Sequence, residues 1–481
     1  LDFGWPEWHV VARCAVVAVT ASSAHWLVYI GTARAGASTI APAIYVQMLG
    51  AVVMGWWWFD NVPDLYTVAG AALPGMAAAE EGEEAADEGV VLDGSFETSV
   101  GMLWAWDYTP RDITDPTDVS LEAALDATFF VSAPLGERFV LTGRVGFSYP
   151  NDTAYPTPEE ITEILSQSFT VYELYGEAFL TDFLTLTAGK KFIPWEMGYF
   201  FSPADFVNLD PLDPEDPEGY REGPLAVTAD FTLLGQHLLV HLFPVDQIRP
   251  WEIASALQFR MNLNNLEARV GARYRYGDPP AASIGLNLEL PVFTPFLEGA
   301  ASIGSRKTYA VETTDPGAWP AGVETRNYTT GFFWTVTAGS SFAIESVGIS
   351  GAFQYLFNAQ GYSGEDYGSF LNARNREILL AGGFLTREDF FLGGSHYGAA
   401  RVDWTIGGSG LTVGLYWIGN MSALSGKLEP SVTWRLFDLL ELRLAVPLVY
   451  HDWGSEFGTG LHNGFAVRAG IALAKDSFRK P

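Results

Sequence analysis

Apolar and polar residues alternate along most of the chain after residue 92. The stretches 257–263 and 266–276 alternate with only the pair 264–265 between them, and 284–290 and 440–444 repeat the pattern. Successive side chains of a strand point to opposite faces, so each stretch predicts a strand with one apolar face. The pair Asn264–Asn265 is typical of a two-residue hairpin turn. We therefore expect mainly antiparallel β-structure over residues 92–475.

The lengths and ends of these segments favour a transmembrane barrel over a soluble sandwich. They run for about 10 residues and often end in aromatic residues, such as Tyr274, Tyr276 and Tyr450, as strands of outer-membrane barrels do. A closed barrel leaves no backbone group without a partner in lipid. Tight connections are expected near 133–137, 181–183, 234–235, 264–265, 291–294, 341–345, 407–410 and 437–439, and long ones near 108–119, 150–169, 192–223, 306–326, 358–397 and 452–462. This alternation predicts about 18 antiparallel strands, within a range of 16–20. Residues 377–394 are interpreted as part of a folded-in loop, with two further strands as the alternative.

The first 79 residues follow a different pattern. Two long apolar runs, 10–32 and 39–59, precede a shorter one that ends at residue 79, which predicts about three short apolar helices. A secretory signal has a single apolar core behind a basic start, so this region is not one. An acidic run follows, and the expected organisation is a helical segment 1–79, a linker 80–91, the barrel 92–475 and a tail 476–481.

Residues 24–73 resemble the end of an EamA-type carrier of the drug/metabolite transporter superfamily. The likeness rests on the small-residue pattern, the APAIY entry to a helix and the closing GAAL. It covers about three of the ten helices that the family implies, and a carrier needs both halves of its inverted repeat to form a substrate site. We therefore interpret residues 10–73 as a truncated transporter remnant, inner-membrane in character, joined to the barrel by a gene fusion or a sequence-assembly error.

Composition narrows the function. Charged residues make up 17% of the chain, below the usual ~25% of soluble proteins. The net charge is −30, which excludes non-specific nucleic-acid binding. Cys14 is the single cysteine, so neither a disulfide framework nor a cysteine metal site is expected. The chain shows no nucleotide-binding, GxSxG or HExxH motif, and we expect no enzyme activity, no cofactor and no metal.

Residues 170–208 resemble a stretch found in several porin-like outer-membrane families of Gram-negative bacteria. The matching positions are Gly189, Lys190, Trp195, Phe201, Pro203, Ala204, Asp205 and Asn208, while Glu196 replaces the usual glycine. The resemblance implies an outer-membrane location, with lipid and lipopolysaccharide around the barrel and the outer-membrane assembly machinery as a partner. It indicates location more than substrate.

Charged residues on the polar face of the strands are the candidate pore lining. Arg260, Arg269, Arg273 and Arg275 are expected on two adjacent strands facing the lumen, and the remaining candidates are Glu267, Glu289, Arg144, Arg435 and Arg443. Rings of charge set selectivity in channels, but a wet lumen wall also carries charges that are merely solvated. The acidic loop 210–223 could hold calcium, although its spacing matches no EF-hand.

The leading hypothesis is a porin-like outer-membrane channel for passive diffusion of small solutes. The alternative is an inner-membrane EamA-type fragment fused to a barrel with a structural role. Apolar and polar residues alternate over the greater part of the chain, and this pattern favours the outer-membrane channel.

Overall fold

The computed structural model describes residues 90–107, 118–136, 138–151, 168–209, 212–243, 253–313, 323–362, 381–383, 392–436, 439–450 and 464–475. The expected helices, the carrier-like stretch 24–73 and most of the linker 80–91 lie outside these residues, as do the tail 476–481 and most of 377–394. Within the described ranges, no helix is both long enough and apolar enough to cross a bilayer.

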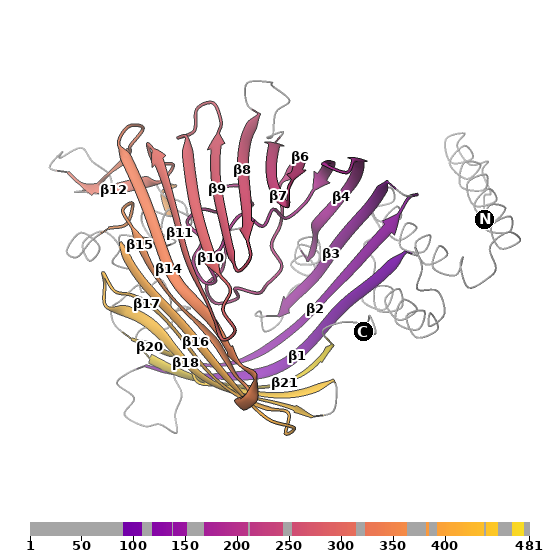
Figure 1. Cartoon of the computed structure of the whole chain (residues 1–481). Coiled ribbons are helices and arrows are strands. Elements are labelled where there is room, and N and C mark those ends of the chain that lie inside the picture. Colours follow the sequence, from indigo (N-terminus) through magenta and orange to yellow (C-terminus); the bar gives the residue numbers. More distant parts are fainter. Residues whose placement is uncertain are drawn as a thin grey trace, which may run out of the picture. The chain divides into compact units, whose positions relative to one another are not determined.

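The described residues form strands almost throughout (Figure 1). The strands are β1 (Val91–Asp107), β2 (Asp118–Pro134), β3 (Phe139–Asn151), β4 (Phe169–Thr181), β5 (Leu184–Lys190), β6 (Leu225–Leu233), β7 (Gln236–Phe243), β8 (Ala254–Leu263), β9 (Leu266–Tyr274), β10 (Ala281–Leu288), β11 (Phe293–Ile303), β12 (Thr308–Glu312), β13 (Val323–Asn327), β14 (Phe332–Ile344), β15 (Ile349–Asn358), β16 (His396–Ile406), β17 (Leu411–Asn420), β18 (Ser425–Leu436), β19 (Leu440–Ala445), β20 (Leu448–Tyr450) and β21 (Gly464–Lys475). The helix η2 is a single 3-10 turn, Glu345–Val347.

One antiparallel sheet closes on itself. β1 pairs with β2 and also with β21, in the register Phe96↔Lys475 to Asp107↔Gly464, and Figure 1 shows the two strands side by side. β19 and β20 both lie between β18 and β21, so they are two parts of one strand. Pro447 separates them because it has no N–H to give to the ladder. The 19 sheet strands of the described chain therefore make an 18-strand closed barrel, which confirms the predicted strand count.

The alternation places apolar side chains outside and polar ones inside. On β8, Leu257 and Phe259 are 46% and 41% exposed, whereas Gln258 between them is 1% exposed. Gln258 and Arg260 donate hydrogen bonds to the backbone carbonyls of Trp195 and Pro194, which belong to a segment inside the barrel. Their face of the strand is therefore the lumen side. The outer face of the barrel is accordingly apolar, with exposed leucine, valine and phenylalanine side chains on most strands.

The hairpin ends agree with the expected tight turns. Asn264 has φ +53° between β8 and β9, as a two-residue turn with left-handed residues requires. Two connections at the opposite barrel end, 275–280 and 421–424, are also short, which the predicted alternation of short and long connections missed. The expected loop 306–326 instead contains the separate hairpin β12–β13.

Residues 191–209 and 212–224, here called the internal segment, stand between β5 and β6 in the chain and belong to no strand of the wall. Their side chains and backbone contact β8, β9, β11, β15 and β17, none of which neighbours β5 or β6 in the sheet. These contacts place the segment within the lumen, where Figure 1 shows it as a trace between the strands. The expected long loop 192–223 thus folds inward.

Candidate functional site

Glu298 on β11 binds one turn of the internal segment. Its carboxylate accepts hydrogen bonds from the backbone N–H groups of Met197 (2.5 Å), Gly198 (3.1 Å) and Ala204 (2.9 Å), and from the Ser202 hydroxyl (3.0 Å). The residue is 1% exposed. Converging N–H dipoles stabilise a buried negative charge, so Glu298 and this turn satisfy one another.

Gln354 on β15 binds the middle of the same turn. Its Oε1 accepts from the N–H groups of Tyr199 (3.1 Å), Phe200 (2.6 Å) and Phe201 (3.2 Å). Its Nε2 donates to the Phe201 carbonyl and to the Thr337 hydroxyl, both at 2.6 Å. One buried amide therefore serves four backbone groups that lie in no helix or sheet.

Residues 194–196 are bound through their carbonyl oxygens. Arg260 donates to the Pro194 carbonyl at 2.8 Å, and Arg269 donates to those of Pro194 (3.0 Å) and Glu196 (2.7 Å). The wall strands β8 and β9 thus supply donors to this stretch of the segment, whereas β11 and β15 supply acceptors to the next.

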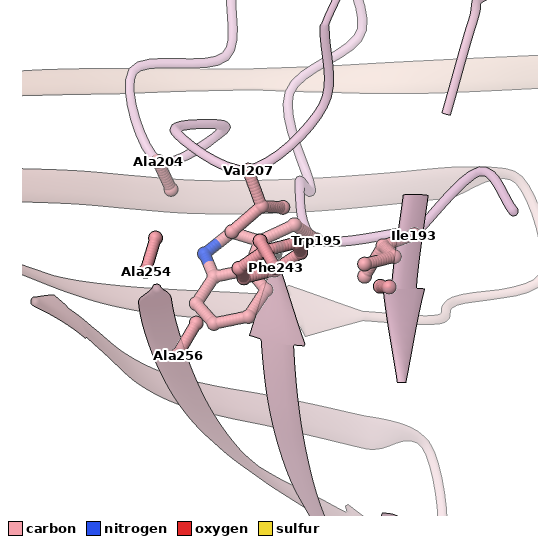
Figure 2. Close-up of a cluster of buried hydrophobic side chains, with 8 residues drawn as sticks. Ile193, Trp195, Ala204, Val207, Phe243, Ala254 and Ala256 are labelled. Carbon is pink, nitrogen blue, oxygen red and sulfur yellow. The ribbon is translucent and has the colours of Figure 1, made fainter. Parts of the chain in front are cut away.

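Apolar contacts fill the space between the segment and the wall. Figure 2 shows Trp195 and Phe243 lying together, with Ala254 and Ala256 projecting toward them from β8. A second cluster joins Phe200 and Phe201 to the wall residues Ala352, Leu356, Tyr397, Ala399 and Ile418. Burying each aromatic side chain contributes about 1.5–3 kcal/mol, so the segment is a packed part of the barrel.

Side chains tie the start of the segment to its middle and to its last residues. Ile193 and Asn208 exchange hydrogen bonds, with Ile193 N–H donating to Oδ1 (3.0 Å) and Nδ2 donating to the Ile193 carbonyl (2.8 Å). Arg221 pairs with Asp205 at 3.0 Å and with Glu196. Glu196, which departs from the glycine of the resembled motif, therefore has a counter-charge inside this segment.

Each matching residue of that motif has a place in or beside the internal segment. Gly189 has φ +133°, and a Cβ there would lie 2.3 Å from the Leu174 carbonyl oxygen. Lys190 pairs with Glu222 at the base of the segment. Trp195, Phe201 and Ala204 are buried, and Trp195 Nε1 donates to the Ser283 hydroxyl at 3.2 Å. Pro203 lies in the turn between Ser202 and Ala204.

The lumen keeps a cavity of about 300 Å³ beside the internal segment. From the segment it is lined by Phe200, Glu215 and Pro217, and from the wall by Arg401, Asp403, Tyr416, Lys427, Glu429, Ser431 and Arg468. The polar and charged character of this lining suits a hydrated solute.

Residues 212–218, here called the acidic arm, face basic residues of the wall. Lys427 donates to Glu215 at 2.9 Å, and the Tyr416 hydroxyl donates to the Pro214 carbonyl at 2.9 Å. Burial raises the pKa of Asp216, and the nearby Asp213 and Glu218 raise it further. The arm thus gathers four carboxyl groups near Lys427, which contacts Glu215 directly.

The wall cations at this cavity have carboxylate partners of their own. Arg401 pairs with Asp403 at 2.6 Å and Arg468 with Glu122 at 2.8 Å. A solute in the cavity therefore meets both signs of charge at close range.

The predicted arginine group divides between two environments. Arg260 and Arg269 face each other in the β8–β9 register and bind the internal segment, as described above. Arg273 and Arg275 lie toward the other end of β9, where Asp278 is 3.1 Å and 3.9 Å from them.

The remaining candidates are distributed around the wall. Glu267 pairs with Arg269 at 2.8 Å, and Glu289 is exposed in the turn after β10. On another part of the barrel, Arg144 lies 3.2 Å from Glu173 and over the Tyr220 ring. Arg435 and Arg443 share Glu441, at 2.5 and 2.6 Å. The candidates thus do not form one patch.

Sequence reasoning missed Glu298 and Gln354. Alternation places both on the lumen face, which is the one signal that the sequence carries. It does not reveal that one and the same turn bonds to both of them. That turn precedes Glu298 by about 100 residues and Gln354 by about 155.

No group of three or more histidine, cysteine, aspartate or glutamate side chains in the described part of the chain could hold a metal ion. His237 lies 3.1 Å from Asp230, and His241 lies 2.8 Å from the Thr228 hydroxyl.

No family model and no curated protein matches the chain in sequence. Solved structures match it in shape: two mutants of the porin of Rhodopseudomonas blastica have TM-scores of 0.39 and 0.40 at 8% and 7% identity. A triple mutant of the same porin has a TM-score of 0.39 at 8% identity. Each match covers 80% of this chain and 100% of the other.

Proposed function

We propose that the barrel is a porin-like channel of a bacterial outer membrane, through which small hydrophilic solutes diffuse passively. The observation that carries this proposal is a closed 18-strand barrel whose lumen is narrowed by the internal segment and keeps a charged cavity beside it.

The apolar outer face supports insertion in a membrane. Exposed Leu257, Phe259 and Val270 are examples from neighbouring strands, and a soluble protein rarely leaves so continuous an apolar surface in water. Closure removes the unpaired strand edges that lipid would not tolerate. Lipid, the lipopolysaccharide of the outer leaflet and the assembly machinery of outer-membrane proteins are the partners that this location would bring.

The distribution of charge supports passage of polar solutes and a preference among ions. Glu215 of the acidic arm lines the cavity from the internal segment, and Arg401, Lys427 and Arg468 line it from the wall. Opposed charges at a constriction orient dipolar solutes and exclude apolar ones. We propose that Arg144, Glu267, Arg273, Arg275, Glu289, Arg435 and Arg443 add to the charged lining, whereas Arg260 and Arg269 act on the pore through the internal segment.

The direct test is conductance. The full chain would be refolded in detergent, shown to be a barrel by a mobility shift between heated and unheated gel samples, and added to planar bilayers. We expect discrete current steps, and swelling of proteoliposomes in small sugars. A folded barrel that gives neither would refute the channel.

That outcome would favour the alternative, a barrel with a structural role joined to a transporter remnant at residues 1–79. Mass spectrometry of the outer-membrane form addresses the remnant separately. A mature N-terminus near Glu80 is expected if residues 1–79 are dispensable. Recovery of residues 10–60 in that fraction would contradict the proposed junction between a transporter remnant and the barrel.

A further inference from the structure

We propose that Glu298 and Gln354 form a latch that holds the internal segment against the wall and keeps the channel in one steady conducting state. This inference rests on the proposed channel function. It assigns these two residues a positioning role.

The latch replaces secondary structure in the turn that it binds. Residues 197–204 lie in no helix or strand, yet the backbone N–H groups of Met197, Gly198, Tyr199, Phe200, Phe201 and Ala204 all donate to these two side chains. Buried N–H groups without an acceptor are costly. The turn therefore keeps its place only while both acceptors are present.

The two latch residues act from separate places on the wall. Glu298 is on β11 and Gln354 on β15, with β14 between them. Within β14, Thr337 pairs in register with both Glu298 and Leu356, and its hydroxyl accepts from Gln354 Nε2. Three adjacent strands thus fix the position and orientation of the turn.

The latched turn leads directly to the cavity. Phe200 has its N–H bound by Gln354, and its side chain lines the cavity next to Tyr416, with ring centroids 6.1 Å apart. A displacement of the turn would therefore change the cross-section of the pore. The acidic arm follows the turn in sequence, so its carboxylates would shift as well.

Loss of the latch would leave several buried donors without partners, and the turn would have to leave the wall to reach water. The apolar contacts of Phe200 and Phe201 oppose this movement but do not satisfy the backbone. The expected result is a segment that exchanges between positions in the lumen.

The test compares the full-length native chain with Glu298→Ala/Gln354→Ala in planar bilayers. We expect the native channel to hold a single current level and the variant to lose it, showing repeated transitions between levels. Glu345→Ala is the matched control: it removes an exposed carboxylate from the turn η2 between β14 and β15, outside the proposed charged lining, and its current should remain steady.

A second readout does not depend on conductance. Chymotrypsin cleaves after aromatic residues, and Tyr199, Phe200 and Phe201 lie in the latched turn. We expect cleavage there in the double variant and resistance in the native chain, with the heat-dependent gel shift of the barrel unchanged. If the native barrel does not conduct but this difference is present, the channel proposal fails and the latch stands.

The isosteric variant Glu298→Gln covers the case in which the double variant does not fold. Its amide keeps one acceptor oxygen but places an NH₂ group among N–H donors, so intermediate protease sensitivity is expected. A folded Glu298→Gln or double variant with native resistance, and with a native current wherever the native channel conducts, would overturn the latch.

Discussion

Arg269 on β9 donates a 2.7 Å hydrogen bond from its guanidinium Nη1 to the backbone carbonyl of Glu196 in the internal segment. The same guanidinium also bonds to Pro194 and pairs with Glu267. Arg269 lies on the lumen face of the wall, but its guanidinium holds the internal segment in position. It is therefore less free to contact a passing solute.

Replacing this arginine should therefore weaken the barrel as well as alter its current. For Arg269→Gln we expect the free energy of unfolding to fall by about 1.5–3 kcal/mol, because hydrogen bonds from a charged group to two backbone carbonyls are lost. Urea unfolding in detergent, followed by tryptophan fluorescence, measures the change. Arg326→Gln is the control, since Arg326 is exposed on β13 and its ion pair is with Glu324. An equal effect of the two substitutions would contradict the positioning role of Arg269.

The acidic arm should favour cations. In the variant Asp213→Asn/Glu215→Gln/Asp216→Asn/Glu218→Gln, we expect the reversal potential in a salt gradient to move toward anion preference, since four carboxylates of the arm that supplies Glu215 to the cavity are neutralised. Planar-bilayer recordings provide the measurement. Asp182→Asn/Glu345→Gln removes carboxylates from exposed turns outside the proposed lining and should leave the reversal potential close to native. An unchanged potential in the arm variant would mean that its charges are screened from the pore.

Gly189 should tolerate no side chain. Its φ of +133° is unfavourable for other residues, and a Cβ would lie 2.3 Å from the Leu174 carbonyl oxygen and 2.6 Å from Tyr175 Cα. For Gly189→Ala we expect destabilisation by about 1–3 kcal/mol, seen as a lower temperature for the gel-mobility transition. Gly407→Ala is the control, because its Cβ would meet nothing within 4 Å. A native transition temperature for Gly189→Ala would show that the local backbone relaxes.

Residues 90–475 should fold without the preceding chain. Their sheet closes through β1 and β21, so every barrel strand has two neighbours within this range. Refolding from inclusion bodies in detergent should give a β-type circular dichroism spectrum and a heat-dependent gel shift. Removing residues 464–475 as well should abolish the shift, because β1 and β19 would lose their common partner. A helical spectrum for residues 90–475 would refute this expectation.

Local pattern was sufficient for the wall of this barrel. Leu257, Phe259 and Gln258 show why: side chains alternate between the two faces of a strand, so apolar periodicity reports the lipid and lumen faces directly. Asn264–Asn265 marked a hairpin because only a few residue types accept left-handed backbone. Antiparallel neighbours joined by such turns must pair, and the number of strands follows from counting them.

Contacts across the lumen were decided by the tertiary structure alone. The sequence by itself determined that Arg269, Glu298 and Gln354 face inward. This depends only on whether a residue occupies an apolar or a polar position in the alternating pattern of its strand. It did not determine that Glu298 and Gln354 bind the turn around Phe200, or that Arg269 binds Glu196, because a loop has no periodicity to report where it folds. That position is set by buried N–H and C=O groups that must find partners, and the partners exist only after the barrel has closed.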